Sequence, residues 1–118
     1  MGLRNSVLLE APQVVFGEKC ITFGCKNCST HLSQSKQVIS DKYRGRLGNA
    51  FLVNKVVNIL RGQAERRHMT TGLYMVCDIK CHQCKKVIGW EYLSADDDTQ
   101  QFKVGKFILE ANGIIYVQ

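Results

Sequence analysis

The sequence has little proline, little tryptophan and no long hydrophobic run. A single proline, Pro12, together with 45% hydrophobic residues, is typical of a folded chain rather than a disordered one. No apolar run approaches the roughly 18 residues that a membrane-spanning helix needs. The first residues, MGLRNSVLLEAPQ, are too short and too weakly apolar for a secretory signal. We therefore expect one intracellular domain, since a chain of 118 residues is long enough to bury its own core.

Helical patterns are also scarce, because no convincing amphipathic stretch exceeds two turns. Short runs rich in β-branched and aromatic residues take their place, among them AFLV, VVNIL, GLYMVCDI, KVIGWEYL and KFILEANGIIYV. Glycines and the acidic segment SADDDT separate these runs as turns. The pattern predicts an all-β domain over residues 19–118, preceded by a flexible arm over residues 1–18.

Six cysteines in an intracellular chain favour metal ligands over disulfides, because thiols stay reduced there. Four of them form Cys25-x2-Cys28 and Cys81-x2-Cys84, with 52 residues between the two pairs. Each pair can curl into a turn that points two sulfurs at one metal, with backbone N–H groups donating to the thiolates. Two such turns build a tetrahedral four-sulfur shell, which suits Zn²⁺ and leaves no open position for water. We predict one structural zinc ion per chain, pinning one end of the domain.

The other two cysteines are interpreted as small buried hydrophobes. Cys77 shares one face of a predicted strand with Leu73, Met75 and Ile79. Cys20 lies five residues before Cys25, a spacing that does not build a metal-binding turn. A thioredoxin-like redox pair would need a Cys-x-x-Cys at the start of a helix in a βαβ unit, and neither flank has that pattern.

Two histidines, His31 and His82, lie close enough to the cysteine pairs to replace a sulfur ligand. Histidines in such positions more often support the ligands or face solvent, and that is our expectation here.

The formal net charge of +6 is uneven along the chain. Residues 1–67 hold eleven Lys and Arg against four Asp and Glu, whereas residues 68–118 hold five against six. A basic half is compatible with a nucleic-acid or acidic partner, and equally with a plain solvated face.

One segment and one aromatic group are candidates for a partner surface. Tyr43, Arg44 and Arg46 lie in the glycine-bounded turn YRGRLG, which can project from a sheet. Trp90 follows Gly89 just beyond a cysteine pair. It either fills the core beside the metal or forms one wall of a shallow aromatic pocket together with Tyr74 or Tyr92.

The cysteine spacing combines with the segments YRGRLGNAFLVNKVVN, TGLYMVCDIKCHQC, IGWEY and FKVGKFILE. Together they resemble the yippee-like family, the fungal members especially, from about Phe23 to Glu110. The resemblance implies a β-tent fold, in which two antiparallel sheets meet at an angle with zinc near the apex. Cereblon's thalidomide-binding domain, Mis18 centromere proteins and zinc-containing methionine sulfoxide reductases share that fold.

The resemblance also bears on function. It implies a small nuclear and cytoplasmic adaptor in proliferation and stress survival, with a CTLH/GID-type ubiquitin ligase as one partner. Trp90 is the only tryptophan where cereblon-type domains have a three-tryptophan cage, so the resemblance does not by itself carry a cereblon-like ligand pocket. No cysteine follows Cys84, although the sulfoxide reductases place a catalytic cysteine late in the chain.

Three functions remain open on the sequence. The first is a non-enzymatic, monomeric, zinc-stabilised protein-interaction module. The second is a nucleic-acid-binding zinc module, whose affinity would fall steeply with salt. The third is a thiol or methionine sulfoxide reductase, which would need Cys20 or Cys77 exposed with a lowered pKa.

Overall fold

The structure, a computed structural model, describes residues 20–117. Within that range the chain forms ten strands: β1 (Thr22–Cys25), β2 (His31–Gln34), β3 (Val38–Arg44), β4 (Asn49–Val53), β5 (Ile59–Arg61), β6 (Glu65–Met69), β7 (Gly72–Cys81), β8 (Val87–Ala95), β9 (Phe107–Glu110) and β10 (Ile114–Val117). Short 3₁₀ helices stand between some of them: η2 (Ser35–Gln37), η3 (Asp98–Lys103) and η4 (Ala111–Gly113). The predicted arm over residues 1–18 lies outside the described residues. None of the described helices is long and apolar enough to span a membrane.

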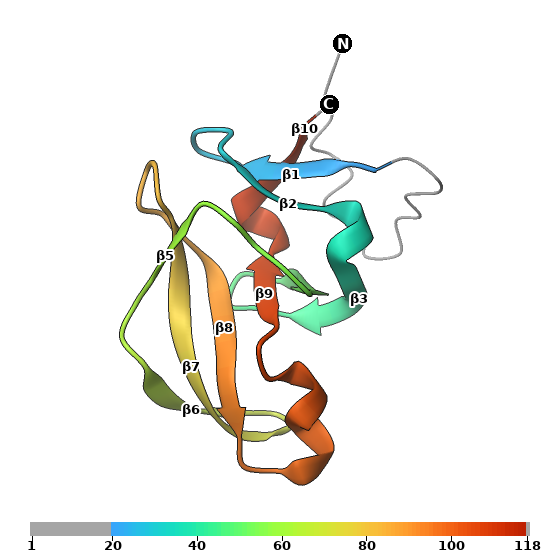
Figure 1. Cartoon of the computed structure of the whole chain (residues 1–118), viewed down its shortest axis with the longest axis vertical. Helices are drawn as coiled ribbons and strands as arrows, with labels where there is room; N and C mark the ends of the chain where they lie inside the picture. Colours follow the sequence, from blue (N-terminus) through green and yellow to red (C-terminus); the bar gives the residue numbers. More distant parts are fainter. Residues whose placement is uncertain (1–19, 118) are drawn as a thin grey trace.

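The strands form two antiparallel sheets, as the family resemblance implies. The small sheet has the order β10-β1-β2, and the large sheet has the order β3-β4-β9-β8-β7-β5 with β6 paired to β7. Figure 1 shows the small sheet across one end of the molecule, while the long β7–β8 hairpin runs toward the other end. The segment around Asn112-Gly113 forms two strands as predicted, and η4 carries the chain from the large sheet to the small one between them.

The central strands of the large sheet are buried on both faces, which explains their nearly continuous apolar sequences. In β4, Phe51 and Val53 pack into one hydrophobic cluster, whereas Ala50 and Leu52 pack into another. Because successive side chains of a strand point to opposite faces, the two clusters lie on opposite sides of the sheet. We call them the zinc-side cluster and the far-side cluster.

The zinc-side cluster joins the two sheets. It contains Phe23 and Ile114 of the small sheet, and the ring of Phe23 stacks on Phe51 with 5.6 Å between centroids. Cys25 and Cys81 belong to the same cluster, so the metal-binding end is continuous with this core.

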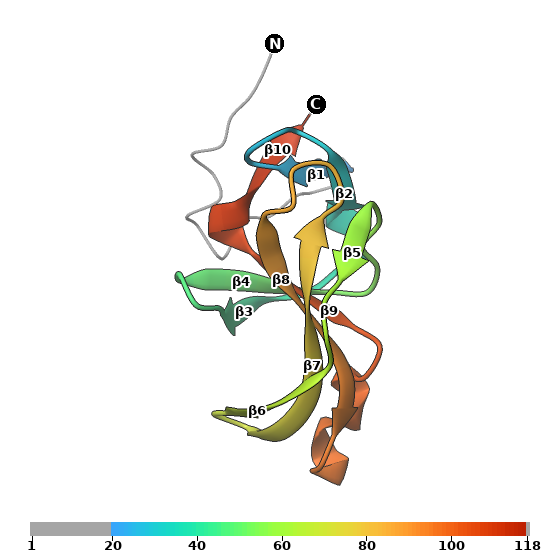
Figure 2. The ribbon, with the colours of Figure 1, turned by 90° about the vertical axis from the view of Figure 1, so that its left-hand side faces the viewer.

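The predicted buried face of β7 is only partly correct. The sequence predicts one buried face with Leu73, Met75, Cys77 and Ile79, but only Cys77 and Ile79 are fully buried there. Leu73 and Met75 are half-buried, because this part of the hairpin extends past the small sheet (Figure 2). Val76, on the other face of β7, is buried in the far-side cluster instead.

Gly89 permits the close approach of two central strands. A Cβ atom at this position would lie 1.7 Å from the carbonyl oxygen of Ile108 in β9, far inside van der Waals contact. Any side chain at residue 89 would therefore push β8 and β9 apart.

We predict that Gly89→Ala destabilises the fold by more than about 3 kcal/mol, because backbone atoms rather than a flexible side chain would have to move. Gly113→Ala is the matched control. Its Cβ would lie 3.7 Å from Ile88, at ordinary contact distance, and we expect a change within about 0.5 kcal/mol. Denaturant unfolding of both zinc-loaded variants measures the difference, and equal midpoints would contradict the close-approach argument.

Candidate metal centre

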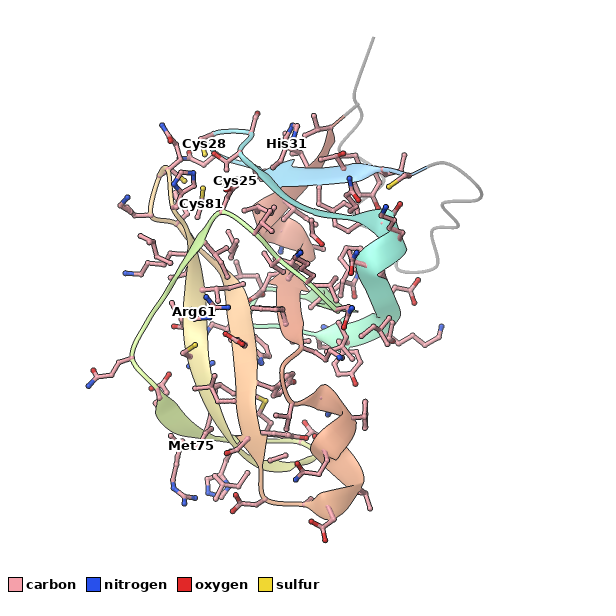
Figure 3. All side chains as sticks on the ribbon, in the orientation of Figure 1. Cys25, Cys28, His31, Arg61, Met75 and Cys81 are labelled. Atoms are coloured by element: carbon pink, nitrogen blue, oxygen red, sulfur yellow. The ribbon has the colours of Figure 1, made fainter. Side chains whose placement is uncertain are left out.

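Two turns bring the four predicted cysteines together. Cys25 ends β1 of the small sheet and Cys81 ends β7 of the large sheet, and each is followed by a turn that carries the second cysteine. The sulfur of Cys25 lies 3.6 Å from that of Cys84, and the sulfur of Cys28 lies 3.5 Å from that of Cys81. All four sulfurs lie within 4.8 Å of one another. Figure 3 shows the labelled cysteines gathered at the end of the molecule where the small sheet lies.

These distances fit one tetrahedral metal ion. With Zn–S bonds of about 2.3 Å, neighbouring sulfurs of a regular tetrahedron lie about 3.8 Å apart. The separations of 3.5 and 3.6 Å are close to that value and far longer than a disulfide bond of about 2.05 Å. A donor set of four thiolates suits Zn²⁺, and four protein ligands close its coordination shell. When bound, the ion would join the two sheets without offering a position for a reacting water.

The two cysteine turns have the same backbone design. The N–H of Ser29 donates to the carbonyl of Cys25 at 2.7 Å, and the N–H of Lys85 donates to the carbonyl of Cys81 at 2.8 Å. Ser29 and Lys85 occupy equivalent positions and both have left-handed backbones, with φ of 66° and 68°. The two halves of the site are therefore pseudo-symmetric.

Hydrogen bonds shape the ionisation of the sulfurs. Burial raises the pKa of Cys25 to about 12, although the N–H groups of Asn27 and Cys28 oppose that shift. The side chain of Asn27 and the N–H of Lys86 lower the pKa of Cys84 to about 6. The sulfurs of Cys25 and Cys84 lie 3.6 Å apart, so the two pKa shifts describe a coupled pair of thiols. Within this pair, Cys84 loses its proton first.

Cys81 has the same kind of donors. Burial acts to raise its pKa, but the N–H groups of Cys84 and Gln83, together with the side chains of Cys28 and Thr30, lower the pKa overall. The predicted N–H donors to the sulfurs are thus present in both turns.

The remaining candidate ligands lie outside the sulfur cluster. His31 and His82 are exposed, in agreement with a surface or supporting role. Cys77 is buried in the large sheet as predicted, where burial and the nearby Glu91 carboxylate raise its pKa. Cys20 is exposed, so its interpretation as a small buried hydrophobe is wrong.

A pocket of about 710 Å³ lies on the far-side cluster. The structure brings five of the predicted partner-surface residues into its lining: Tyr43, Arg44, Arg46, Trp90 and Tyr92. The prediction that Tyr43 and Arg44 lie in a turn is wrong, because both pair with β4 at the end of β3, and only Arg46 lies in the turn that follows. Tyr74 is fully buried, and its ring lies 5.0 Å from that of Tyr92. Trp90 is 7% exposed and belongs to the far-side cluster, so it is a pocket wall and does not pack beside the metal.

Sequence reasoning missed part of this pocket. Its lining includes Arg67 and Met69 of β6, and Gln100, Phe102 and Lys103 of η3. β6 and η3 lie at the end of the molecule opposite the small sheet (Figure 1). The segment FKVGKFILE, which contains Lys103, contributed to the family resemblance. No rule of sequence spacing connects Lys103 to the aromatic residues of β3, β7 and β8, so the sequence did not place it in a pocket.

We predict that the purified chain holds one zinc ion and that chelation unfolds it. Structural zinc contributes on the order of 10–16 kcal/mol in small peptides, which is comparable to or above the net stability of about 5–15 kcal/mol of a domain. Elemental analysis and circular dichroism measure both effects. A metal-free sample with an unchanged spectrum and melting temperature would contradict the prediction.

Single cysteine variants test the ligand assignment. Cys81→Ser should abolish soluble folding because it removes a sulfur ligand. Cys20→Ser is the matched control, and because its side chain is exposed we expect a change within about 0.5 kcal/mol and full zinc content. Cys77→Ala should cost about 1 kcal/mol or somewhat more, since it removes a small buried side chain. Loss of metal from Cys20→Ser would show that the ligand set is wrong.

The left-handed turn positions generate a separate prediction. A side chain at φ near +60° costs roughly 1–2 kcal/mol, so Ser29→Gly should stabilise the zinc-loaded chain by about 0.5–1 kcal/mol after the entropy of glycine is included. Ser94→Gly, at an exposed position of strand β8, should instead destabilise it. Thermal unfolding at a fixed zinc concentration compares the two, and a lower midpoint for Ser29→Gly would contradict the strain argument.

Comparison with known proteins supports the same conclusions. Residues 21–118 match the family model described as "Yippee zinc-binding/DNA-binding /Mis18, centromere assembly". Human protein yippee-like 3 is 42% identical over 93 residues, which cover 79% of this chain and 78% of that protein. Rat protein yippee-like 4 is 40% identical over 94 residues, which cover 80% of this chain and 74% of that protein.

A solved structure has the same fold. The crystal structure of the Mis18 "Yippee-like" domain superposes with a TM-score of 0.67 at 18% sequence identity, covering 85% of this chain and 97% of that domain. Four cysteines positioned for one metal ion agree with the zinc-binding description of the family model. The chain belongs to the Yippee/Mis18 family of zinc-binding domains.

Proposed function

We propose that this chain is a zinc-stabilised module that binds another protein through the far-side pocket. The observation that carries the proposal is the gathering of arginine and aromatic side chains around one pocket, on the sheet face away from the zinc-side cluster. Arginine, tyrosine and tryptophan are the residues that most often dominate the energetics of protein interfaces. Sheets that are joined by a bound metal ion hold such side chains in place, so binding a partner costs little conformational entropy.

The residues at the open edge of the pocket, which we call its rim and which include Lys42, Arg44 and Arg46, are exposed, and this supports the proposal. The side chain of Arg46 is 62% exposed, and Phe102 is 57% exposed. Leu47, in the same loop as Arg46, is 71% exposed. Large apolar side chains beside exposed arginines are typical of a protein-binding surface.

We further propose that the module is non-enzymatic. A closed four-sulfur shell offers no site for metal-assisted hydrolysis. Cys77 is buried and its pKa is raised, which makes it a poor nucleophile for thiol chemistry.

The finer roles rest on family resemblance alone. They are a monomeric adaptor in the nucleus and cytoplasm, a role in stress response and the cell cycle, and attachment to a CTLH/GID-type ubiquitin ligase.

Nucleic-acid binding is the second candidate function. The matching family model includes DNA binding in its description, and the pocket rim carries Lys42, Arg44 and Arg46. Neutralising phosphates with such side chains gives an affinity that falls steeply as salt is raised.

Charge reversal at the rim tests the proposal. Arg44→Glu combined with Arg46→Glu should leave zinc content and melting temperature nearly unchanged, because the ion pair of Arg46 with Asp78, at 3.7 Å, is largely exposed and contributes about 1 kcal/mol at most. The same variant should lose a protein partner that the wild-type chain retains in pull-downs from native lysate, identified by mass spectrometry.

A matched double reversal controls for net charge. Lys36→Glu with Lys55→Glu changes the charge by the same amount at exposed positions outside the pocket and away from the cysteine turns, and it should retain the partner. If the rim variant keeps all its protein partners but loses tight, salt-sensitive binding to RNA or DNA, the nucleic-acid function replaces the adaptor function.

A further inference from the structure

A buried lysine lies in the wall of the pocket without a carboxylate partner. Lys103 ends η3 and is 3% exposed. Its Nζ donates to the hydroxyl of Tyr74 at 3.0 Å and to the hydroxyl of Thr71 at 3.1 Å. An ammonium group has three N–H donors, and across residues 20–117 only these two oxygens lie at hydrogen-bonding distance. One donor therefore remains available to a group in the pocket.

Aromatic rings surround the same ammonium group. Its Nζ lies between 5.2 and 5.7 Å from the centroids of four rings, those of Tyr74, Tyr43, Tyr92 and Phe102. The faces of aromatic rings attract a cation, which offsets part of the cost of removing the charge from water. Rings and hydroxyls are neutral, however, so the positive charge itself has no counter-ion among these contacts.

The pocket rim adds further positive charge. Lys42 and Arg44 make no ion pair with any carboxylate of the described residues, whereas Arg46 and Arg67 both pair with Asp78. No aspartate or glutamate lines the pocket. The pocket thus combines one buried and several exposed cations with a wall of aromatic side chains.

We propose that this pocket binds a peptide carboxylate of the partner protein, with Lys103 as its anchoring residue. The inference rests on the proposed function and names the chemistry of the partner: an aspartate, a glutamate or a free C-terminus next to an apolar side chain. The carboxylate accepts the remaining N–H of Lys103, and Lys42 and Arg44 attract it from the rim. The apolar neighbour packs on Phe102 and Met69.

The position of the cation favours a peptide over a nucleic-acid strand. A single ammonium group that is 3% exposed can be reached by a narrow group at the end of a side chain or chain terminus. A phosphate backbone instead follows an open, positively charged groove. The pocket volume of about 710 Å³ has room for two or three side chains, within the usual range of roughly 300–1,000 Å³ for ligand sites.

Peptide selection tests the inference. The full-length, zinc-loaded chain is used to select from a library of random peptides displayed with free C-termini. We expect the selected peptides to share an acidic residue or a preferred C-terminal residue, beside an apolar one. Replacing the acidic residue by its amide, or amidating the C-terminus, should lower affinity about tenfold or more in fluorescence anisotropy, and it identifies the source of the carboxylate.

Variants of the chain provide the second half of the test. Lys103→Met keeps the length of the side chain and removes its charge, and it should lose about tenfold or more in affinity for the selected peptide. Lys106→Met, three positions after Lys103 and outside the pocket lining, is the matched control and should bind normally. Should Lys103→Met fail to fold, Lys42→Gln at the exposed rim is the deciding variant. We expect its affinity for the selected peptide to fall several-fold and to depend less on salt.

Three results would overturn the inference. Peptides that bind Lys103→Met and Lys42→Gln as tightly as the wild type would show that the carboxylate anchor is wrong, while the protein-binding function stands. An absence of selected peptides, with tight binding of a 20-mer of oligo-dT that both variants lose, would assign the pocket to nucleic acid. Failure of the selection together with a rim-reversed variant that keeps every partner would refute both the anchor and the proposed function.

Discussion

The rest of this structure depends on the contact between four sulfur atoms that come from two different sheets. Cys25 and Cys28 belong to the turn of the small sheet, and Cys81 and Cys84 belong to the end of the long hairpin. A small sheet of three short strands has little surface with which to hold itself on a larger one. The hydrophobic stack of Phe23 on the large sheet and the metal-binding turns act on the same junction, so we expect folding and zinc binding to be coupled.

The large sheet has a different environment on each of its two faces. Its central strands send alternate side chains to the zinc-side cluster and to the far-side cluster, so one β-structure supports two different environments. One face is committed to the small sheet. The other face carries the aromatic residues and cations of the pocket.

Much of the fold and the metal site could be predicted from the sequence because the signals are local. The Cys-x-x-Cys spacing determines a turn by itself, and two such turns in a reduced chain leave few alternatives to a four-sulfur metal site. The strands of the sheet centre were equally readable, since runs such as AFLV and FIL contain no polar residue. The predicted turn was only partly right: Arg46 lies in it, whereas Tyr43 and Arg44 are the last residues of β3 and pair with β4.

Tertiary structure decided the rest, because it sets which face of each strand meets another layer. The burial of β7 changes from one face to the other where the hairpin passes the end of the small sheet, and no periodicity in the sequence marks that place. Cys20 and Cys77 are chemically identical, and only packing makes one exposed and the other buried. Lys103 reads as an ordinary surface lysine in the sequence. Its burial among the rings of β3, β7 and β8 follows from long-range strand pairing, which brings residues up to 60 positions apart around one ammonium group.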